Sequence, residues 1–206
     1  MSATYAGSRL TEAHRLAQSR LGARTVQNLR PIWSLLDPVD IDGSFHGWLD
    51  AVLTIIRSQR STSARLAATS VDLYKKAELG ASALAPILTL AEAVPVEAAA
   101  TSLWVTGPIR IRQAIGRGVD LSRALDLGES QSSAVAMRHV LNGGRQTILS
   151  AVHRDPQIAG WQRVTSGKPC DFCSMLADRG AVYSEDTVDF EAHPGCNCSA
   201  EIVMAE

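Results

Sequence analysis

Hydrophobic residues recur at spacings of three and four through the first part of the chain, which is the pattern of amphipathic helices. The pattern first covers residues 8–36, where we expect a helix that is interrupted at Gly22 and ended or kinked at Pro31. A turn over 37–43 follows, and a second helix is predicted over 44–79. The stripe of this second helix reads Phe45, Leu49, Val52, Ile56, Gln59, Ser63, Leu66, Ser70, Leu73 and Ala77.

The second predicted helix is long, and its stripe is polar in the middle. At 1.5 Å per residue, about 36 residues span roughly 54 Å, which is long for a compact domain. The polar positions from Gln59 to Ser63 indicate either a break or a stretch that leaves the core to meet another chain, and an ordinary helical hairpin explains them equally well. The charged residues around this stretch are therefore candidate partner-binding residues: Arg57, Arg60 and Arg65.

Proline and glycine punctuate the rest of the helical region. Prolines recur through 80–118, where we expect short helices joined by tight turns. A longer helix is predicted over 120–141, and the Asn-Gly-Gly run at 142–144 is expected to stop or bend it. A last helical stretch then ends near Pro156.

After Pro156 the pattern changes to that of short strands. Residues 160–166 alternate as a strand does, and 180–184 and 200–204 are two further candidates. The cysteines lie in the turns between these candidates. A segment of about 45 residues is too small to rely on its own apolar core, so it needs a cross-link of some kind.

These elements predict a mainly α protein in two parts. We expect an elongated helical region with long helices over 1–156 and a small α+β module, stapled by zinc, over 157–206. A hydrophobic content of 46% with 20% charged residues is normal for a globular protein. No apolar run approaches the roughly 18–20 residues that cross a bilayer, and the first residues lack a signal peptide's apolar core. We therefore expect folding in a reducing cytoplasm and no membrane contact.

Charge is distributed unevenly along the chain, although the net charge is only −1. Residues 1–160 contain 17 Lys and Arg against 13 Asp and Glu, whereas residues 161–206 contain 3 against 8, a formal charge of −5. An acidic segment repels phosphate, so this segment is not expected to be a nucleic-acid finger of the ordinary kind.

All four cysteines lie in this acidic segment, together with a histidine. Cys170-x-x-Cys173 has the spacing of a zinc knuckle, and His193-x-x-Cys196-x-Cys198 offers three more ligands about 20 residues later. Structural zinc takes four ligands, so we expect four of the five to bind one Zn²⁺, and the spacing does not choose among them. Disulfides are the alternative, which a reducing cytoplasm disfavours.

Motifs for catalysis are few. Zinc deaminases combine H-x-E with P-C-x-x-C, and residues 169–173 match only the second half. The first half would have to be His153-Arg154-Asp155, with Asp in place of the Glu, and the second cysteine group would be left without a role. The sequence contains no Gly-rich phosphate loop and no G-x-S-x-G elbow, so we expect no enzymatic activity.

The C-terminal motifs together resemble the signature of a known family. They are Trp161-Gln162-Arg163-Val164, Cys170-x-x-Cys173, the run GAVYS at 180–184 and His193-Pro194-Gly195-Cys196-Asn197-Cys198. This arrangement resembles the C-terminal module of the MuF-like minor head proteins of tailed bacteriophages, especially the actinobacteriophage branch. The motifs cover roughly 161–203, and the helical region is similar only in character. Many relatives have a basic residue where Asn197 stands here, which weakens any expected contact with nucleic acid at this position.

The resemblance implies a non-enzymatic minor capsid protein, made in the host cytoplasm and placed on the capsid interior near the portal. It implies roles in head assembly and in DNA packaging or ejection. The implied partners are the portal protein, other capsid proteins or further copies of this chain, with weak or indirect contact to packaged DNA. The alternative is an enzyme, either a capsid maturation protease or another zinc-dependent hydrolase.

Overall fold

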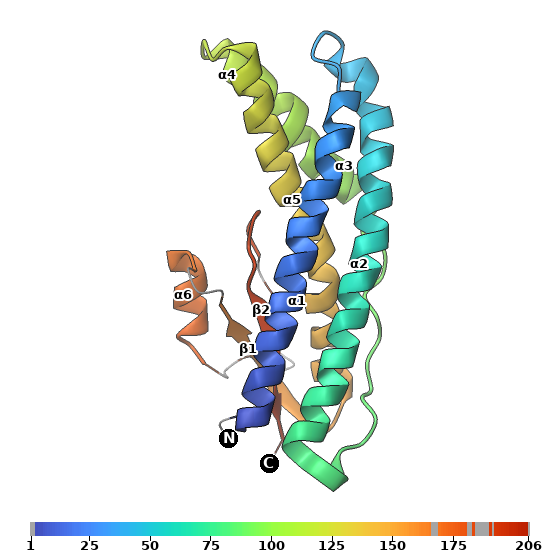
Figure 1. The fold of residues 1–206 in the computed structure, drawn as a ribbon, viewed down its shortest axis with the longest axis vertical. Coiled ribbons are helices and arrows are strands. Elements are labelled where there is room, and N and C mark those ends of the chain that lie inside the picture. The colour runs from blue at the N-terminus through green and yellow to red at the C-terminus, as the bar shows by residue number, and fades with distance from the viewer. Residues whose placement is uncertain (1–2, 166–168, 181–182, 184–189, 191, 206) are drawn as a thin grey trace.

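Three long helices run side by side along the molecule in the computed structural model (Figure 1). They are α1 (Tyr5–Leu29), α2 (Ile41–Leu79) and α5 (Leu121–Arg154). The structure describes residues 3–165, 169–180, 183, 190 and 192–205. Each long helix begins at a side chain that accepts a hydrogen bond from a free N–H of the first turn: Thr4 from Gly7, Asp40 from Gly43 and Asp120 from Arg123. The predicted mainly α fold with long helices is confirmed.

α1 ends near the predicted position but has no break at the predicted position. Leu29 is its last residue, and a 3₁₀ helix, η1 (Arg30–Leu35), follows with Pro31 in its first turn. The predicted interruption at Gly22 is wrong. Gly22 is buried inside α1, and a Cβ there would lie 2.9 Å from Met137 Sδ of α5. This glycine allows close packing of two helices rather than ending one.

α2 is continuous over 39 residues, so the predicted break in its polar middle is wrong. The polar positions bond to the neighbouring helices instead of leaving the core. Thr25 of α1 donates to the side-chain oxygen of Gln59, and Ser63 Oγ donates to Gln18 Oε1 at 2.7 Å. Since these contacts lie within one chain, the polar stripe is accounted for without a second chain.

α5 is also continuous, so the run at 142–144 does not stop it. A Cβ on Gly143 would lie 2.5 Å from the backbone oxygen of Arg60, and one on Gly144 would lie 2.6 Å from Gln18 Nε2. The N–H of Gly144 also donates to Ser63 Oγ at 2.9 Å. The two glycines therefore let α2 and α1 approach α5 closely.

The segment between α2 and the next helix is extended, not helical. After the short 3₁₀ helix η2 (Gly80–Ser82), residues 83–95, here called the strap, contain no helix or strand. The N–H groups of Ile87, Thr89 and Ala91 donate to side chains of Asp155, Ser150 and Thr147 at 3.1, 2.8 and 3.0 Å. The prediction of short helices is thus wrong for the strap.

Short helices do occur after the strap. α3 (Val96–Trp104), the π-helical turn η3 (Val105–Ile109) and α4 (Arg110–Gly116) form one helical run that packs on α5. Pro108 lies inside η3, where the wider turn accommodates a residue that cannot donate an α-helical hydrogen bond. No helix in the described part of the chain has the length and hydropathy to span a membrane.

The C-terminal part forms an antiparallel pair of strands. β1 (Ile158–Val164) and β2 (Ser199–Met204) pair with Trp161 opposite Ile202, which confirms the strands expected at 160–166 and 200–204. Between them lies α6 (Asp171–Ala177). Most of the candidate at 180–184 lies outside the described residues, although Tyr183 forms a bridge with Trp161.

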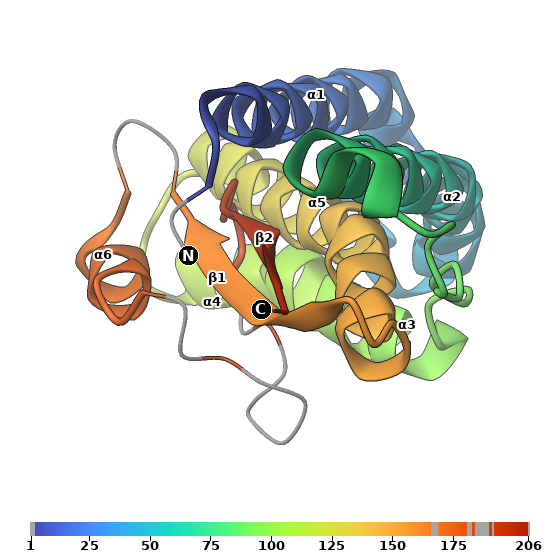
Figure 2. The same cartoon turned by 90° about the horizontal axis from the view of Figure 1, so that it is seen from below.

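Two hydrophobic cores stabilise the molecule. The first lies among α1, α2, α3, α4 and α5 and contains Trp48, Ile56 and Leu103. The second lies between the helices and the strands, where Val71 of α2 and Ile148 of α5 pack in one cluster with Trp161. Figure 2 shows the strand pair lying against the ends of the long helices. The strands therefore share their core with the helical region.

Candidate metal centre

The five predicted ligands come from two segments that the strand pair brings together. Cys170 precedes α6 and Cys173 lies in its first turn, while His193, Cys196 and Cys198 lie in the chain that leads into β2. β1 leads toward α6 and pairs with β2, so the two segments meet at the same end of the pair. All five side chains belong to one cluster, here called the Cys/His cluster.

The cluster consists of two overlapping groups. In one, the ligand atoms of Cys170, Cys173 and His193 lie within 4.8 Å of one another, and in the other those of Cys173, Cys196 and Cys198 do. Cys173 is the member that both groups share. All four cysteines are free thiols, and their side chains lie in groups that could hold a metal ion.

The distances fit a tetrahedral ion bound by sulfur and nitrogen. Zinc bonds of 2.3 Å to sulfur and 2.0–2.1 Å to nitrogen place two sulfurs about 3.8 Å apart and a sulfur and a nitrogen about 3.5 Å apart. Cys173 Sγ lies 3.7 Å from Cys196 Sγ and 3.6 Å from His193 Nε2. Cys170 Sγ lies closer to the imidazole, 3.1 Å from Nε2, which is a hydrogen-bonding distance. Thiolate and imidazole donors in this geometry suit Zn²⁺.

His193 is held in the tautomer that a metal ligand needs. Its Nδ1 lies 2.8 Å from the backbone oxygen of Pro194, which can only accept a hydrogen bond. The proton of a neutral imidazole is therefore on Nδ1, and the lone pair of Nε2 faces Cys170 and Cys173. The same hydrogen bond is the main cause that raises the pKa of His193 above its ordinary value.

The thiols differ in their electrostatic environment. The pKa of Cys196 is lowered to about 4, first by a hydrogen bond from the Cys198 thiol and further by the Arg145 guanidinium. Burial raises the pKa of Cys173 to about 11, and the Cys196 thiolate raises the pKa of Cys198. Cys196 thus favours the thiolate, and the pKa of Cys170 is also lowered, first by a backbone hydrogen bond from Cys173, while Cys173 and Cys198 resist ionisation. A divalent cation would stabilise the further thiolates that coordination requires.

Arg145 supports the cluster and was not expected from the sequence. It is 4% exposed, and its Nη2 donates to the backbone oxygens of Cys196 at 2.8 Å and Cys198 at 2.9 Å. Nη1 donates to Asn142 Oδ1 at 2.7 Å, and the guanidinium lies 4.8 Å from the centre of the Phe190 ring. Burial lowers the pKa of Arg145 to about 10, which leaves it charged at neutral pH. The arginine fixes the backbone that presents two of the ligands.

The three arginines predicted to bind a partner do not share one surface. Arg60 is 5% exposed and donates to the backbone oxygens of Glu92 and His139, each at 2.7 Å, and to the side chain of Gln146. It joins the strap to α5 and is unsuited to a surface contact, which corrects the prediction for this residue. Arg57 and Arg65 are exposed, and eight residues of helix turn them about 80° apart.

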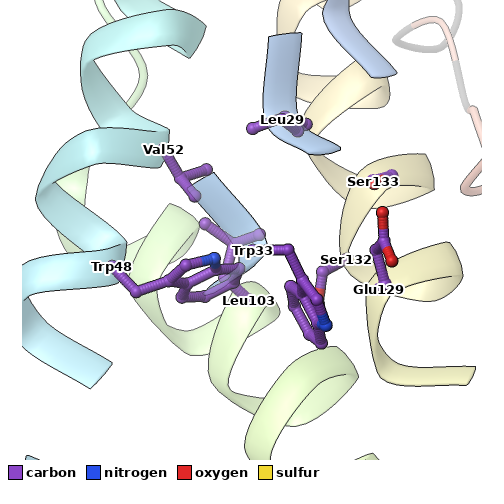
Figure 3. Close-up of a pocket in the computed structure, with 8 residues that line it drawn as sticks. All are labelled: Leu29, Trp33, Trp48, Val52, Leu103, Glu129, Ser132 and Ser133. Carbon is purple, nitrogen blue, oxygen red and sulfur yellow. The ribbon is translucent and has the colours of Figure 1, made fainter. Parts of the chain in front are cut away.

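A small cavity lies beside Trp33 and Trp48 in the first core, but it is too small for a ligand other than water. Trp33, Trp48 and Leu103 line it together with Ser132 of α5 (Figure 3). Its volume of about 10 Å³ holds at most one water molecule. Ser132 Oγ is buried without a hydrogen-bond partner among the described residues, so a single water is the occupant that this cavity suits.

Comparison with known proteins gives one match. A family model described as VG15 protein matches residues 7–206, which include the helical region, the strands and the Cys/His cluster. No curated protein and no solved structure matches the chain significantly.

Proposed function

The chain belongs to the VG15 protein family, a family of viral gene products, and from this premise we propose that it is a structural component of a phage particle. The span of the family match carries the proposal, because it covers both parts of the molecule rather than one motif. Long helices beside a small cross-linked module offer extended surface for protein contacts. We propose that the chain works through such contacts.

More specifically, we propose that the chain is a minor capsid protein that associates with the portal on the capsid interior. The C-terminal motifs support it, since Trp161 to Val164 and His193 to Cys198 resemble the signature of the MuF-like minor head proteins. The role would be in head assembly and in DNA packaging or ejection. The partners would be the portal protein, other capsid proteins or further copies of the chain.

We further propose that four of the five cluster residues hold a structural Zn²⁺. Such an ion would supply a cross-link between α6 and the chain before β2, which covalent bonds do not join. His193 would offer Nε2 and the cysteines their sulfurs, and Arg145 would keep the backbone of Cys196 and Cys198 in place. A structural ion contributes its binding free energy to folding, so this cross-link would stabilise the C-terminal part.

A structural role for the ion is supported by the number and burial of its ligands. A catalytic zinc keeps one position for water, with three protein ligands, whereas this cluster offers five. Cys173 and Cys196 are each 2% exposed and Cys198 is 4% exposed. An ion among them would be enclosed by protein atoms, which favours the structural role over the protease or hydrolase alternative.

Quantitative mass spectrometry of purified particles tests the proposed location. We expect the protein in few copies per particle and enriched in the fraction that retains the portal after capsid disruption. Its absence from particles would contradict the proposal. Incubating the purified protein with the major capsid protein separates the two functions, because zinc-dependent cleavage would establish the enzymatic alternative.

A further inference from the structure

A long stretch of each N-terminal helix contains arginine but no acidic residue. No Asp or Glu occurs between Glu12 and Asp37, nor between Asp50 and Asp72. Arg15 is paired with Glu12, and Arg60 is buried against α5. The remaining arginines of these stretches are exposed and form no ion pair with the residues that the structure describes: Arg20, Arg24, Arg30, Arg57 and Arg65.

A groove between α1 and α2 is lined by residues of these two acid-free stretches. It has a volume of about 450 Å³, and its lining combines apolar residues such as Ala17 and Leu66 with Arg20 and Arg24 on the α1 side. The exposed side chain of Leu16 lies one residue before the lining. We call this surface the α1–α2 groove. Figures 1 and 2 both show α1 and α2 side by side.

The arginines of the groove repel one another. Arg20 and Arg24 are four residues apart in one helix, a spacing at which like charges destabilise the helix by a few tenths of a kcal/mol. Arg65 adds a third charge near the rim, three residues after the lining residue Thr62. A negatively charged occupant would relieve this repulsion.

We propose that the α1–α2 groove binds an acidic amphipathic helix of another protein. Carboxylates pair with the arginines in bidentate fashion, while apolar side chains one turn apart enter between Leu16 and Leu66. A DNA duplex would satisfy the arginines but offers phosphates rather than apolar side chains for the lining. The apolar lining therefore favours a protein. The inference rests on the proposed function only in assigning partner contact to the helical region.

Site-specific photo-crosslinking in cells that produce the virus tests the occupant. The full chain carries p-benzoylphenylalanine in place of Ala17, which lines the groove. We expect an adduct whose mapped peptide is an acidic helical segment of a different protein. An adduct with DNA or with a second copy of this chain, or no adduct above a no-irradiation control, would overturn the proposal.

Charge variants of the same chain test the arginines. Arg20→Glu with Arg24→Glu should reduce the adduct at least tenfold, and Arg20→Gln with Arg24→Gln should reduce it less. Arg117→Glu with Arg123→Glu is the matched control, because both residues are exposed at the far turn between α4 and α5. Thermal unfolding identifies any pair that fails to fold. An unchanged adduct in a folded groove variant would refute the role of the arginines.

The content of particles separates this inference from the proposed function. If the wild-type protein is found in particles but gives no such adduct, the proposed function stands and the binding role of the groove is refuted. An adduct with an acidic protein that never enters particles would support the groove and count against the virion role.

Discussion

Single residues differ in how strongly the Cys/His cluster depends on them. Cys173 belongs to both ligand groups, whereas Cys170 and His193 belong only to one and Cys196 and Cys198 only to the other. Cys170 is exposed, and Cys173 is 2% exposed. Removal of Cys170 or Cys198 still leaves Cys173 with three other ligands, whereas removal of Cys173 leaves two pairs that no shared residue joins.

Zinc content of serine variants tests this asymmetry. Cys173→Ser should lose its zinc almost completely, while Cys170→Ser should retain close to one ion per chain with about ten- to a hundredfold weaker affinity, as changes near a metal's ligands typically cause. The measurement is metal analysis of purified protein combined with competition by a chelator. Equal loss of zinc in both variants would show that Cys170 is as essential as Cys173.

Lys75 and Asp155 form an ion pair that is almost completely buried, with side chains 1% and 2% exposed. Burial alone would raise the pKa of Asp155, but hydrogen bonds from Lys75 and from the N–H groups of Ile87 and Gln157 lower it below its ordinary value. The stability that Asp155 contributes is therefore present above the unfolded pKa of about 4 and lost as the pH falls below it.

Breaking this pair should cost about 3–5 kcal/mol of unfolding free energy, because Lys75→Met leaves a buried carboxylate without its partner. Urea titration of the variant and the wild type gives the difference. The double variant Lys75→Met with Asp155→Asn removes both charges and keeps an acceptor for Ile87, so it should recover part of the loss. A single variant as stable as the wild type would show that the pair is not buried in solution.

The candidate metal ligands could be identified at the residue scale because their chemistry is carried by local spacing. Cys170-x-x-Cys173 and His193-x-x-Cys196 can be identified without knowledge of the fold. Arg145 could not, because the carbonyls to which it donates lie 51 and 53 residues further along the chain. An arginine between helix-forming neighbours has no sequence pattern that distinguishes it from a solvated one.

At the scale of elements, glycines led to wrong predictions of where the long helices are interrupted. The sequence predicts a break at Gly22 and a stop at 142–144 because glycine is intrinsically the poorest helix former after proline. Tertiary packing overrides that propensity, since each glycine faces a neighbouring helix at a distance that leaves no room for a Cβ. The existence and type of the long helices could be predicted from periodicity. The packing role of their glycines could not, because it depends on which helix lies opposite.

Paired glycine variants separate propensity from packing. Gly143→Ala should destabilise the protein by about 1–3 kcal/mol, because its Cβ would lie 2.5 Å from the Arg60 backbone oxygen. Gly47→Ala in α2 has no neighbour within 4 Å, so it should stabilise by about 1 kcal/mol. Thermal or urea unfolding of both variants provides the comparison. A stabilising Gly143→Ala would mean that α2 and α5 are further apart than described.

At the scale of the whole molecule, the second core joins the helices to the strands. Val71, Ile148 and Trp161 belong to one cluster, so the helices bury part of their apolar surface against residues that follow Pro156. The amphipathic pattern shows that these helix positions are buried, but it does not show that the C-terminal strands cover them. That arrangement depends on contacts between residues roughly ninety positions apart and could not be predicted from local sequence.

Removal of zinc should therefore weaken more than the C-terminal segment. Chelation should expose residues 158–204 to limited proteolysis and lower the melting temperature of the whole chain, because the second core loses one of its layers. The first core should keep most of the far-ultraviolet helical signal. Circular dichroism with and without chelator, followed by zinc re-addition as the control, measures both effects. An unchanged melting temperature would show that the two cores unfold independently.

The strap has a consequence for amide hydrogen exchange. Its N–H groups at Ile87, Thr89 and Ala91 donate to side chains of Asp155, Ser150 and Thr147, while those of Leu88 and Leu90 have no hydrogen-bond partner among the described residues. Exchange rates along this segment should alternate between slow and fast, as they do in the edge strand of a sheet. The partners here are side chains of α5 and of Asp155 directly after it, so Ser150→Ala should release the Thr89 amide without unfolding the helix.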